Sequence, residues 1–302
     1  MDLKDKTIVI TGAARGLGAA MAKHLAPQQP KLALVDLRAG DLASTAAACE
    51  QLGARVHCYG ANVAKEADVL RLFDEILAQC GAVHALVNNA GITRDALLIR
   101  FKDGKLESKM SLEQWQTVID VNLTGVFLCG REAAERMIVK GNPGVIINIS
   151  SISRAGNAGQ TNYSASKAGV AAMAVTWSKE LARYGIRAAA IAPGFMNTEM
   201  VAGMKQEARE KLTSGIPLKR MGEPGEIAQT VAFILQNDYV SGRCFEIDGA
   251  RNVALAFGRN GERLEISLAD GAVQASRVPV ENLGAKRFIE RVRRCEAARA
   301  WA

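Results

Sequence analysis

The first 250 residues alternate short apolar runs with longer amphipathic segments, and this alternation limits the possible fold more than any other feature. The apolar runs predict strands at Thr7–Thr11, Lys31–Asp36, Ala54–Tyr59, His84–Asn88, Val145–Ile149, Ile186–Ala192 and Cys244–Asp248. The segments between them predict helices at Leu17–Leu25, Leu42–Leu52, Asp68–Cys80, Leu112–Val139, Tyr163–Tyr184 and Pro224–Leu235. Such strands form parallel sheets covered on both faces. We therefore expect an α/β fold, a single Rossmann-type doubly wound parallel sheet flanked by helices on both faces.

Chain length and composition indicate a globular protein. With 302 residues, 49% of them hydrophobic, the chain can bury a large core. Its apolar runs are far shorter than the roughly 20 residues that cross a bilayer, and the charged amino terminus has no apolar signal region. The six cysteines form no C-x-x-C pair and the three histidines stand apart, so no metal site is expected. These features predict a cytoplasmic protein in a reducing compartment.

The net charge of +7 is concentrated near the carboxyl end, because residues 251–302 account for +4 of it. The first 250 residues are therefore close to neutral, which argues against binding to nucleic acid. We expect neither nucleic acid nor a membrane as a partner.

A glycine-rich turn follows the first predicted strand, in the segment Thr11–Gly18. Glycines let the backbone approach a pyrophosphate closely, and the helix that follows offers its amino-terminal N–H groups to the phosphates. The turn predicts a dinucleotide site whose contacts are Gly12, Arg15, Gly16, Leu17 and Gly18.

Asp36 ends the second strand, 18 residues beyond Gly18. An acid at this place in a Rossmann fold hydrogen-bonds the adenosine ribose and repels a 2′-phosphate, so NAD(H) is favoured. Arg15 and Arg38 lie close enough in the sequence to leave NADP(H) open.

Tyr163 and Lys167 are four residues apart on a predicted helix and project from one face. A tyrosine has an ordinary pKa of about 10, and a neighbouring ammonium can lower it so that the phenol exchanges a proton near neutrality. Ser150 and Ser151 follow the preceding strand, where a hydroxyl can hold a substrate carbonyl beside the tyrosine.

With these motifs in order, residues 3–250 resemble the classical short-chain dehydrogenases/reductases (SDRs). The matching motifs are T-G-x-x-x-G-x-G at Thr11–Gly18, N-N-A-G at Asn88–Gly91, the helix asparagine Asn122, Y-x-x-x-K at Tyr163–Lys167, and Pro193-Gly194 followed by Thr198. The resemblance implies hydride transfer between a nicotinamide and a carbonyl or alcohol carbon.

The resemblance also implies a role for each site residue. Tyr163 exchanges the proton, Lys167 binds the nicotinamide ribose, and Asn122 holds a water that links Lys167 to solvent. The remaining implied cofactor contacts are Asn62 and Val63 at the adenine, Asn89, Ala90, Gly91, Pro193 and Gly194 along the cofactor, and Thr198 at the carboxamide.

Two ways of aligning the family pattern give different residues as the catalytic serine. The family spacing of 13 residues before Tyr163 gives Ser150, whereas the strand pattern I-N-I-S-S gives Ser151 with a loop one residue shorter. Loops accept deletions more readily than strands, which favours Ser151.

Three segments resemble the 3-oxoacyl-(acyl carrier protein) reductases among the SDRs: Gly91–Asp95, Gly156–Tyr163 and Ala192–Phe195. This implies reduction of a 3-oxoacyl thioester, carried by acyl carrier protein or CoA, to the 3-hydroxyacyl form. Three features depart from this pattern: Asp36, an insertion at Lys102–Ser111, and the absence of the family's two carrier-docking arginines. Those arginines would align near Lys140 and at Tyr184, and Arg183 and Arg187 could substitute for them. An NAD-dependent secondary-alcohol or hydroxyacyl dehydrogenase is the alternative.

Other classes also remain open. Lyases and epimerases share the fold, and a nucleotide-sensing protein without catalysis is a more remote interpretation. Residues Met196–Leu218 are expected to form a mobile substrate lid.

Residues 1–250 form the predicted catalytic domain, and residues 251–302 are an atypical extension without family resemblance. Its end, Ala285–Ala302, could form a basic amphipathic helix. The abrupt loss of the family pattern favours a fused segment or translation past a shifted reading frame over a lineage-specific extension. The family implies a homotetramer, which the extension could perturb.

Overall fold

The computed structural model describes residues 1–199, 206–250, 256–257, 263–269 and 272–278. The chain divides into two compact units, Met1–Arg251 and Asn252–Ala302. All site residues predicted from the sequence belong to the first unit.

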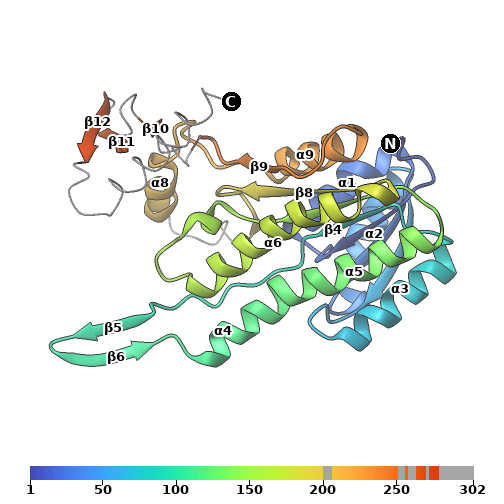
Figure 1. The fold of residues 1–302 in the computed structure, drawn as a ribbon, viewed down its shortest axis with the longest axis horizontal. Helices are drawn as coiled ribbons and strands as arrows, with labels where there is room; N and C mark the ends of the chain where they lie inside the picture. Colours follow the sequence, from blue (N-terminus) through green and yellow to red (C-terminus); the bar gives the residue numbers. More distant parts are fainter. Residues whose placement is uncertain (200–205, 251–255, 258–262, 270–271, 279–302) are drawn as a thin grey trace, which may run out of the picture. The chain divides into compact units, whose positions relative to one another are not determined.

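The first unit is built on a seven-stranded sheet with the order β3-β2-β1-β4-β7-β8-β9 (Figure 1). Its strands are β1 (Thr7–Thr11), β2 (Lys31–Asp36), β3 (Arg55–Gly60), β4 (Ala85–Asn88), β7 (Gly144–Ile149), β8 (Ile186–Pro193) and β9 (Cys244–Ile247). Every pairing between neighbouring strands is parallel. The strand order reverses between β1 and β4, which is where open α/β sheets bind their ligands.

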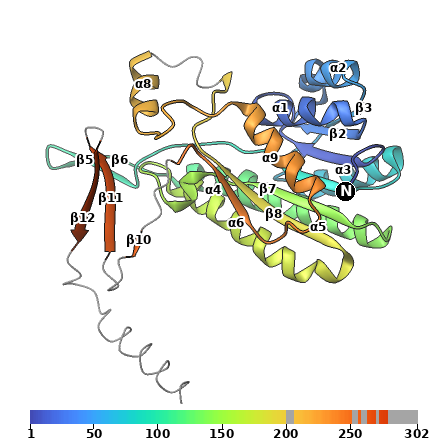
Figure 2. The same ribbon diagram turned by 90° about the horizontal axis from the view of Figure 1, so that it is seen from above.

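Helices cover both faces of this sheet, as Figure 2 shows for α1 and α9 on one side and α5 and α6 on the other. The helices are α1 (Gly16–Leu25), α2 (Ala43–Gln51), α3 (Glu66–Cys80), α4 (Leu112–Ile119), α5 (Gly125–Val139), α6 (Thr161–Glu180), α8 (Gln206–Ser214) and α9 (Pro224–Gln236). Alternate residues of β1 serve different faces, since Ile8 and Ile10 join one buried cluster and Val9 joins the other. This confirms the predicted doubly wound fold.

Short helical turns complete the first unit. They are η1 (Ala26–Gln28), η2 (Ala39–Leu42), η4 (Ile152–Ala155) and η5 (Ala182–Tyr184). A π-helical turn, η3 (Asp120–Thr124), joins α4 to α5 where the periodicity predicts one continuous helix. Such a turn is a single wide turn inside a helix, and the hydrophobic spacing did not predict it.

The predicted insertion at Lys102–Ser111 lies largely in a β-hairpin that follows β4. Strand β5 (Ile99–Lys102) pairs antiparallel with β6 (Lys105–Lys109), and every residue of both strands is exposed. Asp103 and Gly104 make the turn, with φ angles of 50° and 74°. Asp-Gly between two short runs is a strong hairpin signal, and it was present in the sequence.

The second unit contains a three-stranded antiparallel sheet of β10 (Ala256–Phe257), β11 (Arg263–Ala269) and β12 (Ala272–Val278). The alternation of apolar and polar residues in β11 agrees with this pairing. The helix predicted for Ala285–Ala302 lies outside the described residues.

Candidate active site

The predicted site residues converge at the carboxyl edge of the central sheet. The glycine-rich turn follows β1, Asn89 follows β4, Ser150 and Ser151 follow β7, and Gly194 follows β8. Parallel strands place their carboxyl ends together, so residues distant in sequence share one crevice.

Close packing explains the glycines of the first turn. Gly12 and Gly16 have φ angles of 66° and 56°, which side chains rarely adopt. A Cβ on Gly18 would lie 2.0 Å from the main-chain oxygen of Gly12, so only glycine allows α1 to approach the turn. Above Gly16 the space is open, and a Cβ there would meet no atom within 4 Å.

The first turn of α1 has unsatisfied donors. Its N-cap residue Arg15 is exposed and makes no side-chain capping bond, and no acidic side chain lies in the first turn, which includes Leu17. No side-chain cap therefore competes for the N–H groups and the positive end of the helix dipole at this turn. This donor set fits the phosphates of a dinucleotide.

The side chains of Thr11 and Asn89 hydrogen-bond the backbone around the glycine-rich turn. The Thr11 hydroxyl oxygen accepts from the main-chain N–H groups of Asn89 and Ala90, each at 3.0 Å. The Asn89 amide nitrogen donates to the carbonyls of Thr11 and Gly12 at 2.9 and 3.0 Å. The side chain of Asn89 thus holds the backbone of the turn.

Asp36 lies beside the turn, at the end of β2. Its carboxylate accepts from the N–H groups of Ala14 at 3.0 Å and Leu37 at 2.8 Å. Arg38 turns away to pair with Asp41 at 3.0 Å. The Asp36 carboxylate is thus held in place by two N–H groups, and Arg38 is already paired.

The next predicted contacts, Asn62 and Val63, follow β3. The Asn62 side-chain oxygen accepts from Ala64 N–H at 3.0 Å, and its own N–H donates to Asp68 at 3.1 Å. Val63 is buried, and the start of α5 packs so closely on it that a Cβ on Gly125 would lie 3.0 Å from its side chain.

The reactive groups lie on the first turns of α6. The hydroxyl of Tyr163 hydrogen-bonds the side chain of Ser151. The Lys167 ammonium lies 5.6 Å from the centre of the Tyr163 ring and donates to the carbonyl of Ile149 at 2.7 Å. The structure therefore brings Ser151, Tyr163 and Lys167 together.

Ser150 has a different partner. It is buried, and its hydroxyl donates at 2.6 Å to the main-chain oxygen of Lys167. Ser151 is half-buried and also accepts from Ser153 N–H at 3.1 Å. The two serines point to opposite sides of their strand, as successive residues in an extended backbone do.

Burial governs the ionisation of the pair. It raises the pKa of Tyr163 above the ordinary value, while the bond with Ser151 lowers it and the charge of Asp95 raises it. Burial also lowers the pKa of Lys167 from 10.5 to about 8. The spacing predicts a tyrosine pKa lowered by the lysine, and the structure differs because both groups are buried and the ammonium is directed at Ile149.

Asn122 is fully buried in the π-helical turn and holds the segment after β4. Its side-chain oxygen accepts from Ile92 N–H at 2.8 Å, and its amide nitrogen donates to the Ile92 carbonyl at 2.9 Å. A Cβ on Gly91 would lie 3.4 Å from the Asn122 oxygen and 3.5 Å from the Lys167 nitrogen. Gly91 thus lies between the two side chains.

Asn162, which the sequence motifs did not single out, joins three segments around Tyr163. It is fully buried, and its amide nitrogen donates to the carbonyls of Arg94 at 3.0 Å and Gln114 at 2.9 Å. Its oxygen accepts from Tyr163 N–H at 2.8 Å. In the sequence, the only sign of this role was that a polar residue directly precedes the tyrosine.

Residues after β8 close the other side of the crevice. Pro193 is the last residue of β8, and Gly194 N–H donates to the carbonyl of Ile247 at 2.9 Å. Thr198 N–H donates to the carbonyl of Met196 at 2.9 Å. Of the predicted lid, residues 200–205 lie outside the described residues.

The expected carrier-docking substitutes are engaged elsewhere. The guanidinium of Arg187 donates to three main-chain oxygens at 2.7–3.1 Å and pairs with Asp238 at 3.4 Å. Arg183 stacks on the Tyr184 ring at 4.8 Å. Arg187 therefore has little capacity left for a partner.

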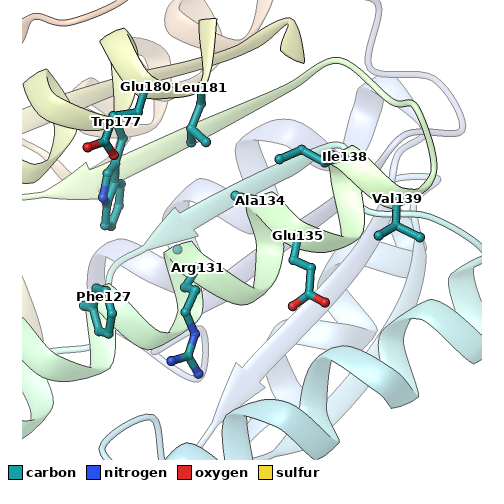
Figure 3. Close-up of a pocket in the computed structure, with 10 residues that line it drawn as sticks. Phe127, Arg131, Ala134, Glu135, Ile138, Val139, Trp177, Glu180 and Leu181 are labelled. Atoms are coloured by element: carbon teal, nitrogen blue, oxygen red, sulfur yellow. The ribbon is translucent and has the colours of Figure 1, made fainter. Parts of the chain in front are cut away.

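A surface groove runs between α5 and α6, away from the carboxyl edge (Figure 3). Trp177 packs over Gly130, where a Cβ would lie 2.5 Å from its ring, and Arg131 lies 5.6 Å over the Phe127 ring. The groove is lined by Phe127, Gly130, Arg131, Ala134, Glu135, Ile138, Val139, Trp177, Glu180 and Leu181.

Membrane spans and metal clusters are both absent from the part of the chain that the structure describes. No helix there is both long and apolar enough to cross a bilayer. No group of three or more His, Cys, Asp or Glu side chains in those same residues is placed to hold a metal ion.

Comparison with known proteins identifies the family. The short chain dehydrogenase family matches residues 6–209. A 3-oxoacyl-(acyl-carrier-protein) reductase of Thermotoga maritima is 41% identical over 82% of this chain and 98% of its own length. An acetoacetyl-CoA reductase of Synechocystis is 41% identical over 83% of this chain and 98% of its own length. The crystal structure of a short-chain type dehydrogenase/reductase from Mycobacterium marinum, 28% identical, superposes with a TM-score of 0.75 over 84% of this chain and 98% of that one. The chain belongs to the short-chain dehydrogenase family.

Proposed function

We propose that this protein reduces a 3-oxoacyl thioester to the 3-hydroxyacyl form with a nicotinamide cofactor. The observation that carries the proposal is the hydrogen bond between Ser151 and Tyr163 beside the buried Lys167, at the carboxyl edge where the strand order reverses. The relatives named 3-oxoacyl-(acyl-carrier-protein) reductase and acetoacetyl-CoA reductase support this substrate class.

Tyr163 is the proton donor in this proposal. A nicotinamide bound in the crevice would supply the hydride that reduces the carbonyl carbon, and Tyr163 would give its phenolic proton to the carbonyl oxygen. Because burial raises the pKa of Tyr163, the phenol stays protonated at neutral pH, as a donor must.

Ser151, Lys167 and Asn122 position the reacting groups. Ser151 holds the substrate oxygen next to the phenol, since its hydroxyl already bonds that of Tyr163. Lys167 would bring a positive charge to the site and hydrogen-bond the nicotinamide ribose once the cofactor is bound. Asn122 holds the segment after β4 next to Lys167. By the family resemblance, it would also hold a water that links Lys167 to solvent.

We propose NAD(H) as the preferred cofactor and leave NADP(H) as the alternative for measurement. The Asp36 carboxylate, fixed by two N–H groups, would accept from the ribose hydroxyls and repel a 2′-phosphate. Arg38 is paired with Asp41, which leaves Arg15 as the nearby arginine for a phosphate. Thr198 would contact the carboxamide.

We propose a homo-oligomer, with a tetramer as the family expectation, in the cytoplasm. Phe127 is 43% and Val139 73% exposed beside the α5–α6 groove, and apolar surface of this kind usually marks an interface. Light scattering should give a lower mass for Phe127→Asp than for the control Tyr239→Asp, whose side chain is 99% exposed. The five cysteines in the described residues are unpaired, in keeping with a reducing compartment.

The test is the absorbance of the reduced nicotinamide with acetoacetyl-CoA, with NADH and NADPH compared side by side. Faster oxidation of NADH is expected. A preference for NADPH would overturn the role given to Asp36, and no oxidation of either cofactor would overturn the substrate class.

Replacing Tyr163 with Phe removes the donor and keeps the ring. Turnover should fall on the order of 10²–10⁴-fold, the usual contribution of a general acid. Binding of NADH, followed by fluorescence, should hardly change. A Tyr163→Phe enzyme with normal turnover would exclude the mechanism.

A further inference from the structure

The hairpin of β5 and β6, residues 99–109, stands away from the rest of the first unit and is called the hairpin arm (Figure 1). Ile99, Phe101 and Leu106 are 58%, 64% and 52% exposed. A two-stranded hairpin alone is marginally stable in water, and exposed apolar side chains add a cost. The hairpin arm therefore has the composition of a surface that is covered in use.

The charges of the hairpin arm indicate the sign of its partner. It carries Arg100, Lys102, Lys105 and Lys109 against Asp103 and Glu107. Arg100 pairs with Glu107 at 2.7 Å, while the three lysines have no ion-pair partner among the described residues. Lys102 and Lys105 are direct cross-strand neighbours, an arrangement of like charges that destabilises a hairpin. An anionic partner would relieve this repulsion.

The base of the hairpin arm is tied to the reacting groups. Ala96 N–H donates to the carbonyl of Gly159 at 2.9 Å, and Ala96 forms a bridge with Gln160 at the start of α6. Asn162 holds the carbonyl of Arg94 and the N–H of Tyr163. The hairpin arm therefore leaves the body at the rim of the crevice that contains Tyr163.

We propose that the hairpin arm is a docking surface for an acidic carrier protein that presents the acyl thioester to Tyr163. The inference rests on the proposed function and names the partner of that site. The lysines meet carboxylates of the carrier, and the pair Phe101 and Leu106, directly opposite each other, packs on its apolar surface. The position at the rim favours a substrate carrier over a membrane or a second copy of the chain.

The test compares two substrates on the full-length enzyme: acetoacetyl-acyl carrier protein, and acetoacetyl-N-acetylcysteamine, which has no protein surface. The variant is Lys102→Glu with Lys105→Glu. It inverts the charge of the hairpin arm but keeps two like charges opposite each other, so the repulsion within the hairpin stays similar to that in the wild type. The control is Lys4→Glu with Lys23→Glu, which makes the same change at exposed lysines near the amino edge of the sheet.

We expect the hairpin variant to raise KM for the carrier-bound substrate about tenfold or more, with kcat unchanged and the small thioester unaffected. Raising the salt concentration should raise the same KM for the wild type and not for the variant. The control should match the wild type on both substrates.

The two hypotheses fail separately. If the wild type reduces neither thioester, the proposed function is wrong. If it reduces both and the hairpin variant keeps the wild-type KM for the carrier, only the docking surface is wrong. The docking surface is also wrong if the variant keeps the wild-type KM for the carrier but forms a smaller oligomer by light scattering. The same holds if it keeps that KM but binds anionic vesicles less well than the wild type.

Discussion

At the scale of single residues, Ser150 and Ser151 show how neighbours acquire different tasks. The Ser150 hydroxyl donates to the main-chain oxygen of Lys167 at 2.6 Å and is buried. The Ser151 hydroxyl bonds Tyr163. Because successive side chains of an extended backbone point in opposite directions, only one of the two can reach the substrate.

Single alanine substitutions separate the two serines. Ser151→Ala should lower kcat on the order of 10²–10³-fold, the usual cost of removing one donor to the reacting oxygen. Ser150→Ala should keep turnover but lower the free energy of unfolding by about 1–3 kcal/mol, because a buried carbonyl loses its donor. Steady-state rates and urea unfolding of both variants measure this. The reverse pattern would assign the reaction to Ser150.

Lys167 gives the pH dependence of stability a defined sign. Its pKa is lowered to about 8 in the folded protein, against 10.5 when unfolded, so between these values the unfolded chain binds more protons. Folding is therefore favoured as pH rises through this window. Wild type should gain about 2 kcal/mol relative to Lys167→Met between pH 7 and pH 9.5.

Urea unfolding of the wild type and of Lys167→Met at the two pH values measures this difference. The comparison removes the effect of every other titrating group, and the carbonyl of Ile149 loses its donor in the variant at both pH values. Equal pH dependence in the two proteins would show that Lys167 titrates alike folded and unfolded.

At the scale of elements, the contact between the glycine-rich turn and α1 decides whether the phosphate site forms. The helix starts at Gly16, and Gly18 touches the carbonyl of Gly12. This close approach directs the free N–H groups of the first turn into the crevice. The hairpin arm is the opposite case, since within the described residues its two strands pair only with each other.

Gly18→Ala should displace α1 from the turn, because its Cβ would lie 2.0 Å from the Gly12 oxygen. We expect NADH affinity to fall at least tenfold and the protein to lose about 1–3 kcal/mol of stability. Gly225→Ala in α9 is the matched control, since a Cβ there meets no atom within 4 Å. Calorimetric titration with NADH compares them, and equal affinities would contradict the packing explanation.

At the scale of the whole molecule, the parallel sheet and all the predicted site residues lie in the first unit. The seven strands of the parallel sheet and both large buried clusters lie within Met1–Arg251. No predicted site residue lies beyond Thr198. We therefore expect the extension to be dispensable for folding and chemistry.

A protein ending at Arg251 should keep the thermal unfolding midpoint and the acetoacetyl-CoA rate of the full chain to within a factor of two or so, because its core is complete. Light scattering of both proteins tests whether residues 252–302 perturb the oligomer. A truncated protein that fails to fold would show that the second unit supports the first.

Much of the fold could be predicted from local pattern. Continuous apolar strands alternating with helices have one common solution, a parallel sheet covered on both faces, so the strand ranges and the crevice followed from periodicity. The hairpin was missed although Asp103-Gly104 signalled it, because its strands carry no buried face and hence no hydrophobic period.

By itself, the sequence determined the doubly wound sheet and its glycine-rich turn, because strand burial and glycine turns are local properties, and its resemblance to a family implied the other residues of the site. The tertiary structure alone decided which serine bonds Tyr163, where the Lys167 ammonium points, and that Asn162 joins three segments. Those facts depend on contacts between residues far apart in the chain, and on burial, which shifts the pKa of Tyr163 upward against the expectation from its lysine neighbour.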